Sequence, residues 1–211
     1  MTRIVLVDDH PMMRQGIRQL LELQDDFEVV AEASNGEEAL EKVAQYQPDM
    51  ILMDLNMKGM DGIQTVDALR QRGETACILM ITVSDNDNDV IAALRAGADG
   101  YLLKDVEPEE LIKAVLAAER GNLVVSPQLT RILARALRDE EPARNHLTAE
   151  LTGREMEILK MIAAGSSNKL IARELGISEA TVKVHVKNLL KKLNFRSRVE
   201  AAVWAVSNHV L

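Results

Sequence analysis

The chain has 211 residues, of which 47% are hydrophobic and 27% are charged, an ordinary composition for a globular protein of one or two domains. No stretch approaches the roughly 18 uncharged apolar residues of a membrane span, and the first residues lack the order of a secretory signal. The single cysteine, Cys77, lies in an apolar run and cannot form an internal disulfide. We therefore expect a cytoplasmic protein with no membrane partner and an inert, buried thiol.

The formal net charge of −8 is distributed unevenly along the chain. Residues 1–120 contain 11 Lys/Arg and 24 Asp/Glu, a charge of −13, whereas residues 147–211 contain 10 and 6, a charge of +4. An acidic first part and a basic second part suggest two modules with different partners. The sequence predicts domains at 1–120 and 147–211, joined by a linker at 121–146.

The first 120 residues alternate short apolar runs with segments of helical spacing. The runs lie at 4–7, 29–33, 50–53, 78–82 and 100–103, and they are typical of parallel strands covered on both faces. Pro11, Pro108 and the capping-box spacing of Ser34 and Glu37 indicate helix starts. Five such repeats predict an α/β fold, a flavodoxin-like (βα)5 domain.

The rest of the chain is predicted to be helical. A helix starting at Ser126 falls within the linker, whose residues 139–145 look solvated. Thr152 and Glu155 have capping-box spacing, a second helix covers 168–175, and two more begin after Ser178 and Ser197. The turn at Gly176 gives helix-turn-helix spacing, so we expect an all-α domain of four helices.

Three carboxylates follow predicted strands. Asp8 and Asp9 come directly after the first strand, and Asp54 comes directly after the third. If these strands are neighbours, as in the flavodoxin-like order, the carboxylates converge at the carboxyl edge of the sheet. Their mutual repulsion calls for a cation, and oxygen ligands favour Mg²⁺. Asp54 is then a candidate nucleophile toward a phosphoryl group.

Two more polar residues end strands at the same edge, Thr82 after the fourth strand and Lys104 after the fifth. Each residue alone has an ordinary explanation, as a turn former, a strand end or a surface lysine. Their joint placement favours a phosphoryl-binding site, in which Thr82 donates a hydrogen bond and Lys104 supplies a positive charge. Tyr101 is either a half-buried strand residue or part of this site.

A basic helix is predicted in the second domain. Residues 179–198 hold six Lys/Arg and one acid, and Lys183, Lys187 and Lys191 fall on one helical face. A solvated face is the simpler explanation of such a stripe. The turn at Gly176 favours a recognition helix that enters the major groove of DNA. Trp204 is expected in the core, with a dimer contact as the alternative.

Three segments resemble the receiver domain of NarL/FixJ-type response regulators: Val7-Asp8-Asp9-His10-Pro11, residues 49–57 and residues 97–104. The resemblance covers residues 3–120, and it departs at Lys58, where the family often has proline. It implies a role for each of these residues: the phosphorylated Asp54, the Mg²⁺ ligands Asp8, Asp9, Asp54 and Asn56 (through its carbonyl), the switch pair Thr82 and Tyr101, and the phosphate-sensing Lys104.

Residues 147–208 resemble the LuxR-type DNA-binding domain, through Leu151-Thr152-Gly153-Arg154-Glu155 and the segments 168–172 and 181–187. Gly153 stands where many members have proline. The resemblance implies two kinds of DNA contact: to bases by Lys183, Val184 and Lys187, and to phosphates by Lys169, Thr181 and Lys191. Both halves together are most similar to the nitrate/nitrite response regulators.

These observations predict a DNA-binding transcription regulator that is not an enzyme. A sensor histidine kinase phosphorylates Asp54, and a homodimer then binds promoter DNA. In the resting state the acidic domain lies over the basic helix, and on phosphorylation Tyr101 turns inward. Two alternatives stay open: an Mg²⁺-dependent phosphohydrolase, although Asn56 stands where such enzymes have a second acid, and a DNA-binding module that ignores phosphate.

Overall fold

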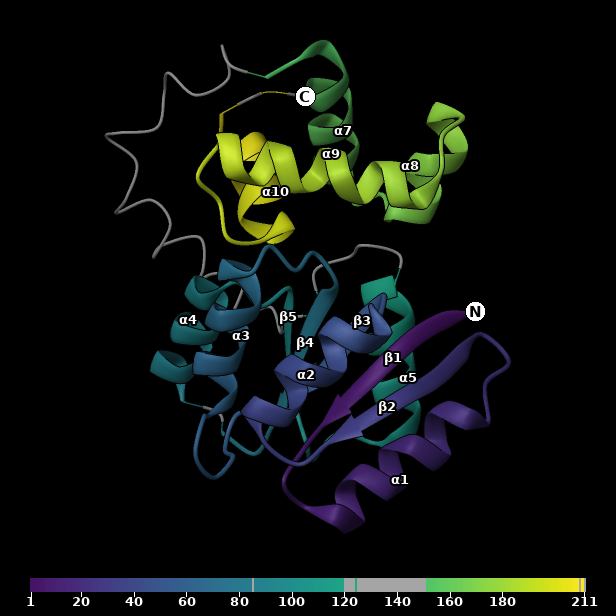
Figure 1. Cartoon of the computed structure of the whole chain (residues 1–211), viewed down its shortest axis with the longest axis vertical. Coiled ribbons are helices and arrows are strands. Elements are labelled where there is room, and N and C mark those ends of the chain that lie inside the picture. The colour runs from purple at the N-terminus through teal and green to yellow at the C-terminus, as the bar shows by residue number, and fades with distance from the viewer. Residues whose placement is uncertain (85, 120–123, 125–150, 209, 211) are drawn as a thin grey trace.

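A computed structural model describes residues 1–84, 86–119, 124, 151–208 and 210 (Figure 1). The predicted linker helix starting at Ser126 lies outside the described residues. Figure 1 shows an α/β domain formed by the first part of the chain and a helical domain formed by the last part. Among the described residues, no helix is long and apolar enough to cross a membrane.

The α/β domain is built on a parallel sheet of five strands in the order β2-β1-β3-β4-β5. The strands are β1 (Thr2–Val7), β2 (Phe27–Ala33), β3 (Met50–Met53), β4 (Cys77–Thr82) and β5 (Gly100–Leu103). All five predicted runs are strands, and the first and third are neighbours. The flavodoxin-like prediction is therefore confirmed, including the adjacency on which the convergence of the carboxylates depends.

Helices cover both faces of this sheet. They are α1 (Pro11–Glu22), α2 (Gly36–Tyr46), α3 (Gly62–Gln71), α4 (Asp87–Ala96) and α5 (Pro108–Glu119). Successive strand residues point to opposite faces, so Ile4 and Leu6 pack with α1 and α5, whereas Val5 and Val7 pack with α2, α3 and α4. Burial on both sides explains why the central strands β3 and β4 are almost continuously apolar, whereas the edge strand β2 contains Glu28 and Glu32.

Side-chain caps fix where the helices begin. Pro11 is the first residue of α1, as predicted. The prediction for α2 was wrong by one residue, because the cap is Asn35, whose side chain accepts a hydrogen bond from the Glu38 N–H. Ser34 instead donates through its N–H and its hydroxyl to the Glu38 carboxylate. Serine and asparagine can both cap a helix, and here the backbone conformation places Asn35 at the cap position.

Residues 151–208 contain four helices, as predicted: α7 (Gly153–Ala163), α8 (Asn168–Leu175), α9 (Glu179–Lys192) and α10 (Arg198–Ser207). The capping box of Thr152 and Glu155 is present, and Gly176 ends α8 with a φ of +64°. Trp204 is buried in the core of this domain, with its ring 5.6 Å from that of Phe195. The helix-turn-helix thus consists of α8, the Gly176 turn and α9.

Cys77 is the first residue of β4, and the residue as a whole is partly exposed, which corrects the expectation of full burial. Burial of the thiol, with a further contribution from the charge of Asp99, raises its pKa to about 12. A thiol with that pKa stays protonated at neutral pH, which agrees with the expected inertness.

Replacement of Gly153 by proline is expected to stabilise the helical domain by roughly 0.4–1 kcal/mol. Gly153 is the first residue of α7, where the N–H has no partner within the helix, and a Cβ there meets no atom within 4 Å. Thr152 has φ −69° and ψ 159°, which suit the residue before proline. Urea unfolding followed by Trp204 fluorescence measures the gain. Gly176→Ala, at a positive φ, is the control and should lose roughly 1 kcal/mol.

Candidate functional site

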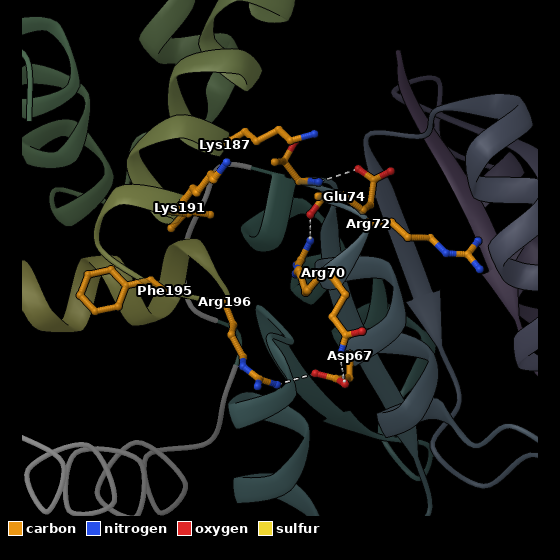
Figure 2. A pocket seen from close by; sticks show the side chains of 12 residues that line it. Asp67, Arg70, Arg72, Glu74, Lys187, Lys191, Phe195 and Arg196 are labelled. Carbon is orange, nitrogen blue, oxygen red and sulfur yellow. Dashed lines mark hydrogen bonds and ion pairs between the residues drawn. The ribbon is translucent and has the colours of Figure 1, made fainter.

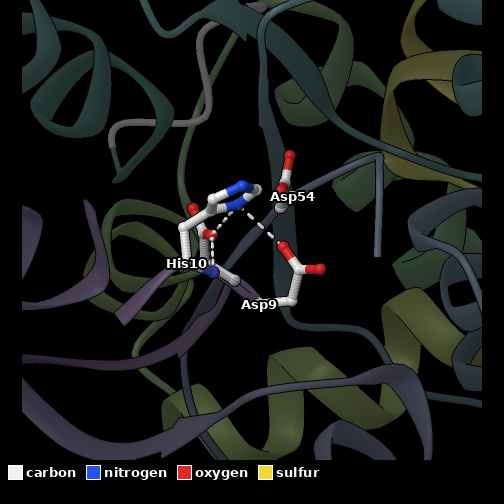
Figure 3. Close-up of side chains that lie close together, drawn as sticks. Asp9, His10 and Asp54 are labelled. Atoms are coloured by element: carbon white, nitrogen blue, oxygen red, sulfur yellow. Dashed lines mark hydrogen bonds and ion pairs between the residues drawn. The ribbon is translucent and has the colours of Figure 1, made fainter. Parts of the chain in front are cut away.

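An acidic cluster lies at the carboxyl ends of β1 and β3. Asp8 and Asp54 are buried, and Asp9 is partly exposed. One oxygen from each carboxylate and one ring nitrogen of His10 all lie within 4.8 Å of one another (Figure 3). The three predicted carboxylates are therefore brought together, and His10 is an addition that the sequence did not single out.

Lys104 holds the two buried carboxylates together. Its ammonium lies 2.8 Å from Asp8 Oδ2 and 2.9 Å from Asp54 Oδ2. Burial lowers the pKa of Lys104, but the hydrogen bonds and charges of both acids outweigh it and raise the pKa above its usual value. The Lys104 N–H also donates to the Thr82 carbonyl at 2.7 Å, which ties the ends of β4 and β5 together. Lys104 therefore lies where a phosphoryl group on Asp54 would need a positive charge.

Backbone and side-chain hydrogen bonds fix the loops that carry the acids. The Asp54 N–H donates to the Val7 carbonyl at 2.8 Å, and the Asn56 N–H donates to the Asp54 carboxylate. The guanidinium of Arg14 donates to the Asp8 carbonyl at 2.5 Å and to Glu32 at 2.9 Å. These contacts hold the loops after β1 and β3 in place before any ligand binds.

The charges of the cluster suit a divalent cation. Asp8, Asp9 and Asp54 carry three formal negative charges and Lys104 carries one positive charge, so the net formal charge of the four side chains is −2. Burial raises the pKa of Asp54, against the lowering effect of Lys104. Within the described residues, Asp9 Oδ1 is buried without a hydrogen bond, although His10 Nδ1 lies 2.7 Å from it. Carboxylate and carbonyl oxygens are hard ligands, so the residues fit Mg²⁺.

The two predicted switch residues lie beside this cluster. Thr82 ends β4 and is fully buried, and its hydroxyl accepts a hydrogen bond from the Ser84 N–H at 3.2 Å. Tyr101 is only 3% exposed, and its hydroxyl donates to the Ser84 carbonyl at 2.9 Å. The ring already points inward, so the predicted inward turn does not start from this conformation. Both side chains contact the same loop after β4, which is where they could act together.

The predicted DNA contacts are distributed over one face of α9 and its surroundings. Val184 is 58% exposed, and Thr181 and Lys169 are also exposed. Lys187 and Lys191 are exposed too, whereas Lys183 is half-buried, and both Lys183 and Lys187 lie against the α/β domain. The Lys183 ammonium lies 2.8 Å from Asp49 Oδ1, and a Cβ added to Gly73 would lie 2.5 Å from the Lys187 ammonium. Two of the three predicted base contacts are therefore turned toward the other domain.

The contact between the domains lies at the amino ends of the strands, opposite the acidic cluster. Asp49 directly precedes β3 and Gly73 precedes β4, and Figure 1 shows α9 and α10 next to this edge of the sheet. Arg196 forms an ion pair with Asp67 of α3 (Figure 2), and Val199 of α10 belongs to the same buried cluster as the sheet. Burial raises the pKa of Asp49, but the hydrogen bonds and charges of Lys183 and Arg3 together outweigh it and hold the pKa below its usual value.

The basic helix was predicted to be covered by the acidic domain, but nothing in the sequence indicated the receiver residues of this contact. Asp49 stood within a recognised motif, but nothing marked it as the partner of Lys183. Asp67 and Gly73 carried no signal of their own, since one is an ordinary helix residue and the other an ordinary turn glycine. The charge difference between the two domains was the only available signal, and it indicates attraction without naming partners.

Family comparisons match both domains. Residues 4–116 match the response regulator receiver domain, and residues 149–205 match the bacterial regulatory proteins of the luxR family. Among solved structures, a LuxR-family two-component response regulator from Aurantimonas is similar with a TM-score of 0.59 and 37% identity, over 64% of this chain and 96% of that one. The response regulator ChrA of a heme-sensing two-component system is similar over 100% of this chain and 98% of its own, at 37% identity and a TM-score of 0.52.

Curated relatives match nearly the whole chain. The nitrate/nitrite response regulator protein NarL of Escherichia coli K12 is 52% identical over 95% of this chain and 93% of its own length. The nitrate/nitrite response regulator protein NarP of the same strain is 50% identical over the same shares. The chain therefore belongs to the NarL/FixJ-type response regulators, transcription regulators in which a receiver domain under phosphorylation control is joined to a LuxR-type DNA-binding domain.

Proposed function

We propose that this protein is the transcription regulator of a nitrate/nitrite-type respiratory response, and that a sensor histidine kinase controls it by phosphorylating Asp54 in the cytoplasm. The nitrate/nitrite assignment rests on the relatives that match the chain at about half identity. The observation that carries the chemical assignment is the arrangement of Asp54, with a buried lysine and two further carboxylates around it.

The proposed reaction is a phosphoryl transfer to the Asp54 carboxylate. One carboxylate oxygen attacks phosphorus, the bond from phosphorus to the kinase histidine breaks, and an acyl phosphate forms. Asp8, Asp9, Asp54 and the Asn56 carbonyl would hold Mg²⁺, which supplies charge neutralisation for the transferred group. Lys104 would leave Asp8 and pair with a phosphoryl oxygen, and Thr82 would donate its hydroxyl to another.

The proposed control acts through the contact between the domains. Lys183 is paired with Asp49 and the Lys187 ammonium lies beside Gly73, so the receiver covers part of the DNA-binding face of α9 while the domains stay together. Phosphorylation would shift the population toward separated domains, in which these lysines and Val184 face the bases and Lys169, Thr181 and Lys191 face phosphates. Two copies would then bind promoter DNA as a homodimer, one on each half-site.

The same site could belong to a phosphohydrolase, but the residue two positions after Asp54 argues against it. Hydrolases of that kind generally use a second acid there, and Asn56 cannot act as a general acid. We therefore propose that the chain is not an enzyme and that the phosphoryl group stays on Asp54 as a signal. Sustained release of phosphate from a phosphate ester would contradict this assignment.

Intact-mass spectrometry after incubation with acetyl phosphate tests the chemistry. Wild type with Mg²⁺ is expected to gain one phosphoryl group, which is lost at alkaline pH because acyl phosphates hydrolyse readily. Asp54→Ala should gain none, and chelation of Mg²⁺ should abolish the gain in wild type. Asp67→Ala, which removes an acid of the same domain outside the cluster, is the matched control and should be phosphorylated like wild type. An unphosphorylated wild type would overturn the assignment.

A further inference from the structure

The side chain of His10 is directed at the acidic cluster and not at the helix that follows it. His10 is the N-cap residue of α1, yet its side chain makes no capping hydrogen bond. Ser, Thr, Asp and Asn are favoured at that position because their side chains do make one. The His10 Nδ1 instead lies 2.7 Å from Asp9 Oδ1 and 3.4 Å from Asp8 Oδ1 (Figure 3). The ring therefore belongs to the cluster and contributes nothing to the cap.

The backbone holds His10 in this position. Its N–H donates to Asp8 Oδ1 at 2.7 Å, and Pro11 directly after it begins α1. The Lys104 ammonium contacts Oδ2 of both Asp8 and Asp54, whereas His10 lies beside Oδ1 of Asp8. The His10 side chain is 68% exposed, so an ion from solvent can reach Nδ1 without a change in the fold.

The separations of the four ligand atoms fit one small ion. One oxygen each from Asp8, Asp9 and Asp54 and one ring nitrogen of His10 lie within 4.8 Å of one another. Two ligands of a tetrahedral Zn²⁺ are about 3.3 Å apart, because each lies about 2.0–2.1 Å from the metal. The two distances from His10 Nδ1, 2.7 and 3.4 Å, lie on either side of that value. Within the described residues, Asp9 Oδ1 is buried without a hydrogen bond, so this oxygen still needs a partner.

We propose that His10 makes this cluster a second kind of metal site, for a divalent transition ion that prefers nitrogen, with Zn²⁺ as the representative. Mg²⁺ takes oxygen ligands, so the three acids and the Asn56 carbonyl suffice for it and His10 adds nothing. Zn²⁺ takes an imidazole nitrogen together with carboxylate oxygens. Its four ligands are His10, Asp8, Asp9 and Asp54, the set that the distances bring together.

The two ions have opposite effects on Asp54, a consequence that rests on the proposed phosphorylation. Six-coordinate Mg²⁺ keeps positions for water and for a phosphoryl oxygen. A Zn²⁺ site with four protein ligands is closed, as structural zinc sites are, and it leaves no position for the phosphoryl group. The Asp54 carboxylate is then a metal ligand and is not free to attack phosphorus. The metal site itself does not depend on any phosphorylation.

Isothermal titration calorimetry on the full chain, without a phosphodonor, tests the site with ZnCl₂ and MgCl₂ as separate ligands. Wild type is expected to bind Zn²⁺ at least roughly tenfold tighter than Mg²⁺. His10→Gln should weaken Zn²⁺ at least roughly tenfold, since loss of even an outer-shell partner can weaken a metal that much, and should leave Mg²⁺ unchanged. The variant should fold like wild type because His10 is exposed and makes no cap bond. His185→Gln on α9, outside the cluster, is the matched control and should bind both ions like wild type.

Equal Zn²⁺ affinity in wild type and His10→Gln would overturn the proposal. Stronger binding of both ions by His10→Gln would do the same, because it would show that His10 only places a competing positive charge beside the acids. Excess Zn²⁺ in the acetyl phosphate assay should suppress phosphorylation of wild type more than that of His10→Gln. Zn²⁺ binding that depends on His10, in a protein that acetyl phosphate never modifies, would support the metal site and contradict only the proposed function.

Discussion

Gly62→Ala is expected to destabilise the receiver domain by about 3 kcal/mol or more. Gly62 begins α3, and a Cβ there would lie 2.1 Å from the Asp54 carbonyl oxygen and 2.9 Å from the Leu55 Cα. Both are backbone atoms, so no side-chain rotation can relieve the overlap. The Gly62 N–H also donates to the Leu55 carbonyl at 2.9 Å, which fixes the close approach. Urea unfolding followed by circular dichroism should show an earlier transition.

Gly16→Ala is the matched control for this substitution. Gly16 lies inside α1, and a Cβ at that position meets no atom within 4 Å. Alanine has the higher helix propensity, so this variant should gain roughly 0.5–1 kcal/mol. If Gly62→Ala unfolded at the same urea concentration as wild type, the loop after Asp54 would not be packed as described. The two glycines thus separate a close backbone contact from ordinary helix propensity.

Asp49→Lys is expected to raise the affinity of the unphosphorylated protein for duplex DNA roughly tenfold. The change removes the partner of Lys183 and places a second cation beside it. The ion pair is about one third exposed on each side, with side-chain exposures of 31% and 34%, so its effect is smaller than that of a fully buried pair. Fluorescence anisotropy with a labelled duplex at fixed salt measures the change.

Added positive charge alone strengthens binding to DNA, so the experiment needs a control with the same charge change. Glu41→Lys on α2 provides it, because Glu41 is exposed and does not line the contact between the domains. The affinity should rise much less in this variant than in Asp49→Lys. Equal increases in the two variants would mean that the Lys183–Asp49 pair does not restrain DNA binding.

The fold and the acidic cluster were predictable from the sequence because their determinants are local or follow a rule of topology. Continuous apolar runs mark buried parallel strands, and the carboxyl ends of neighbouring strands meet at one edge. Asp8, Asp54 and Lys104 each follow such a run, which places them together without further information. The start of α2 was misplaced because Ser34 and Asn35 are both good caps, and only the backbone distinguishes them.

The sequence predicted that the acidic domain lies over the basic helix, but the receiver residues of that contact were not predictable, because they depend on how two folded surfaces meet. Asp49 and Gly73 belong to different loops, and their roles exist only when α9 lies against them. The orientation of Tyr101 is likewise a rotamer that its position in β5 does not determine. Composition predicted that the domains attract each other, but a net charge carries no information on register or partner.

The acidic cluster and the domain contact lie at opposite ends of β3, which links Asp54 to Asp49 directly. Five residues of strand span roughly 17 Å, about twice the distance over which physiological salt screens a charge. A phosphoryl charge on Asp54 therefore cannot act on Lys183 through solvent. The effect of phosphorylation on the domain contact must instead be transmitted by a shift of packed strands and loops. Such coupling is reciprocal at equilibrium. Under the proposed control, DNA that holds α9 away from Asp49 would therefore favour the phosphorylated protein at equilibrium by the same factor by which phosphorylation favours DNA binding.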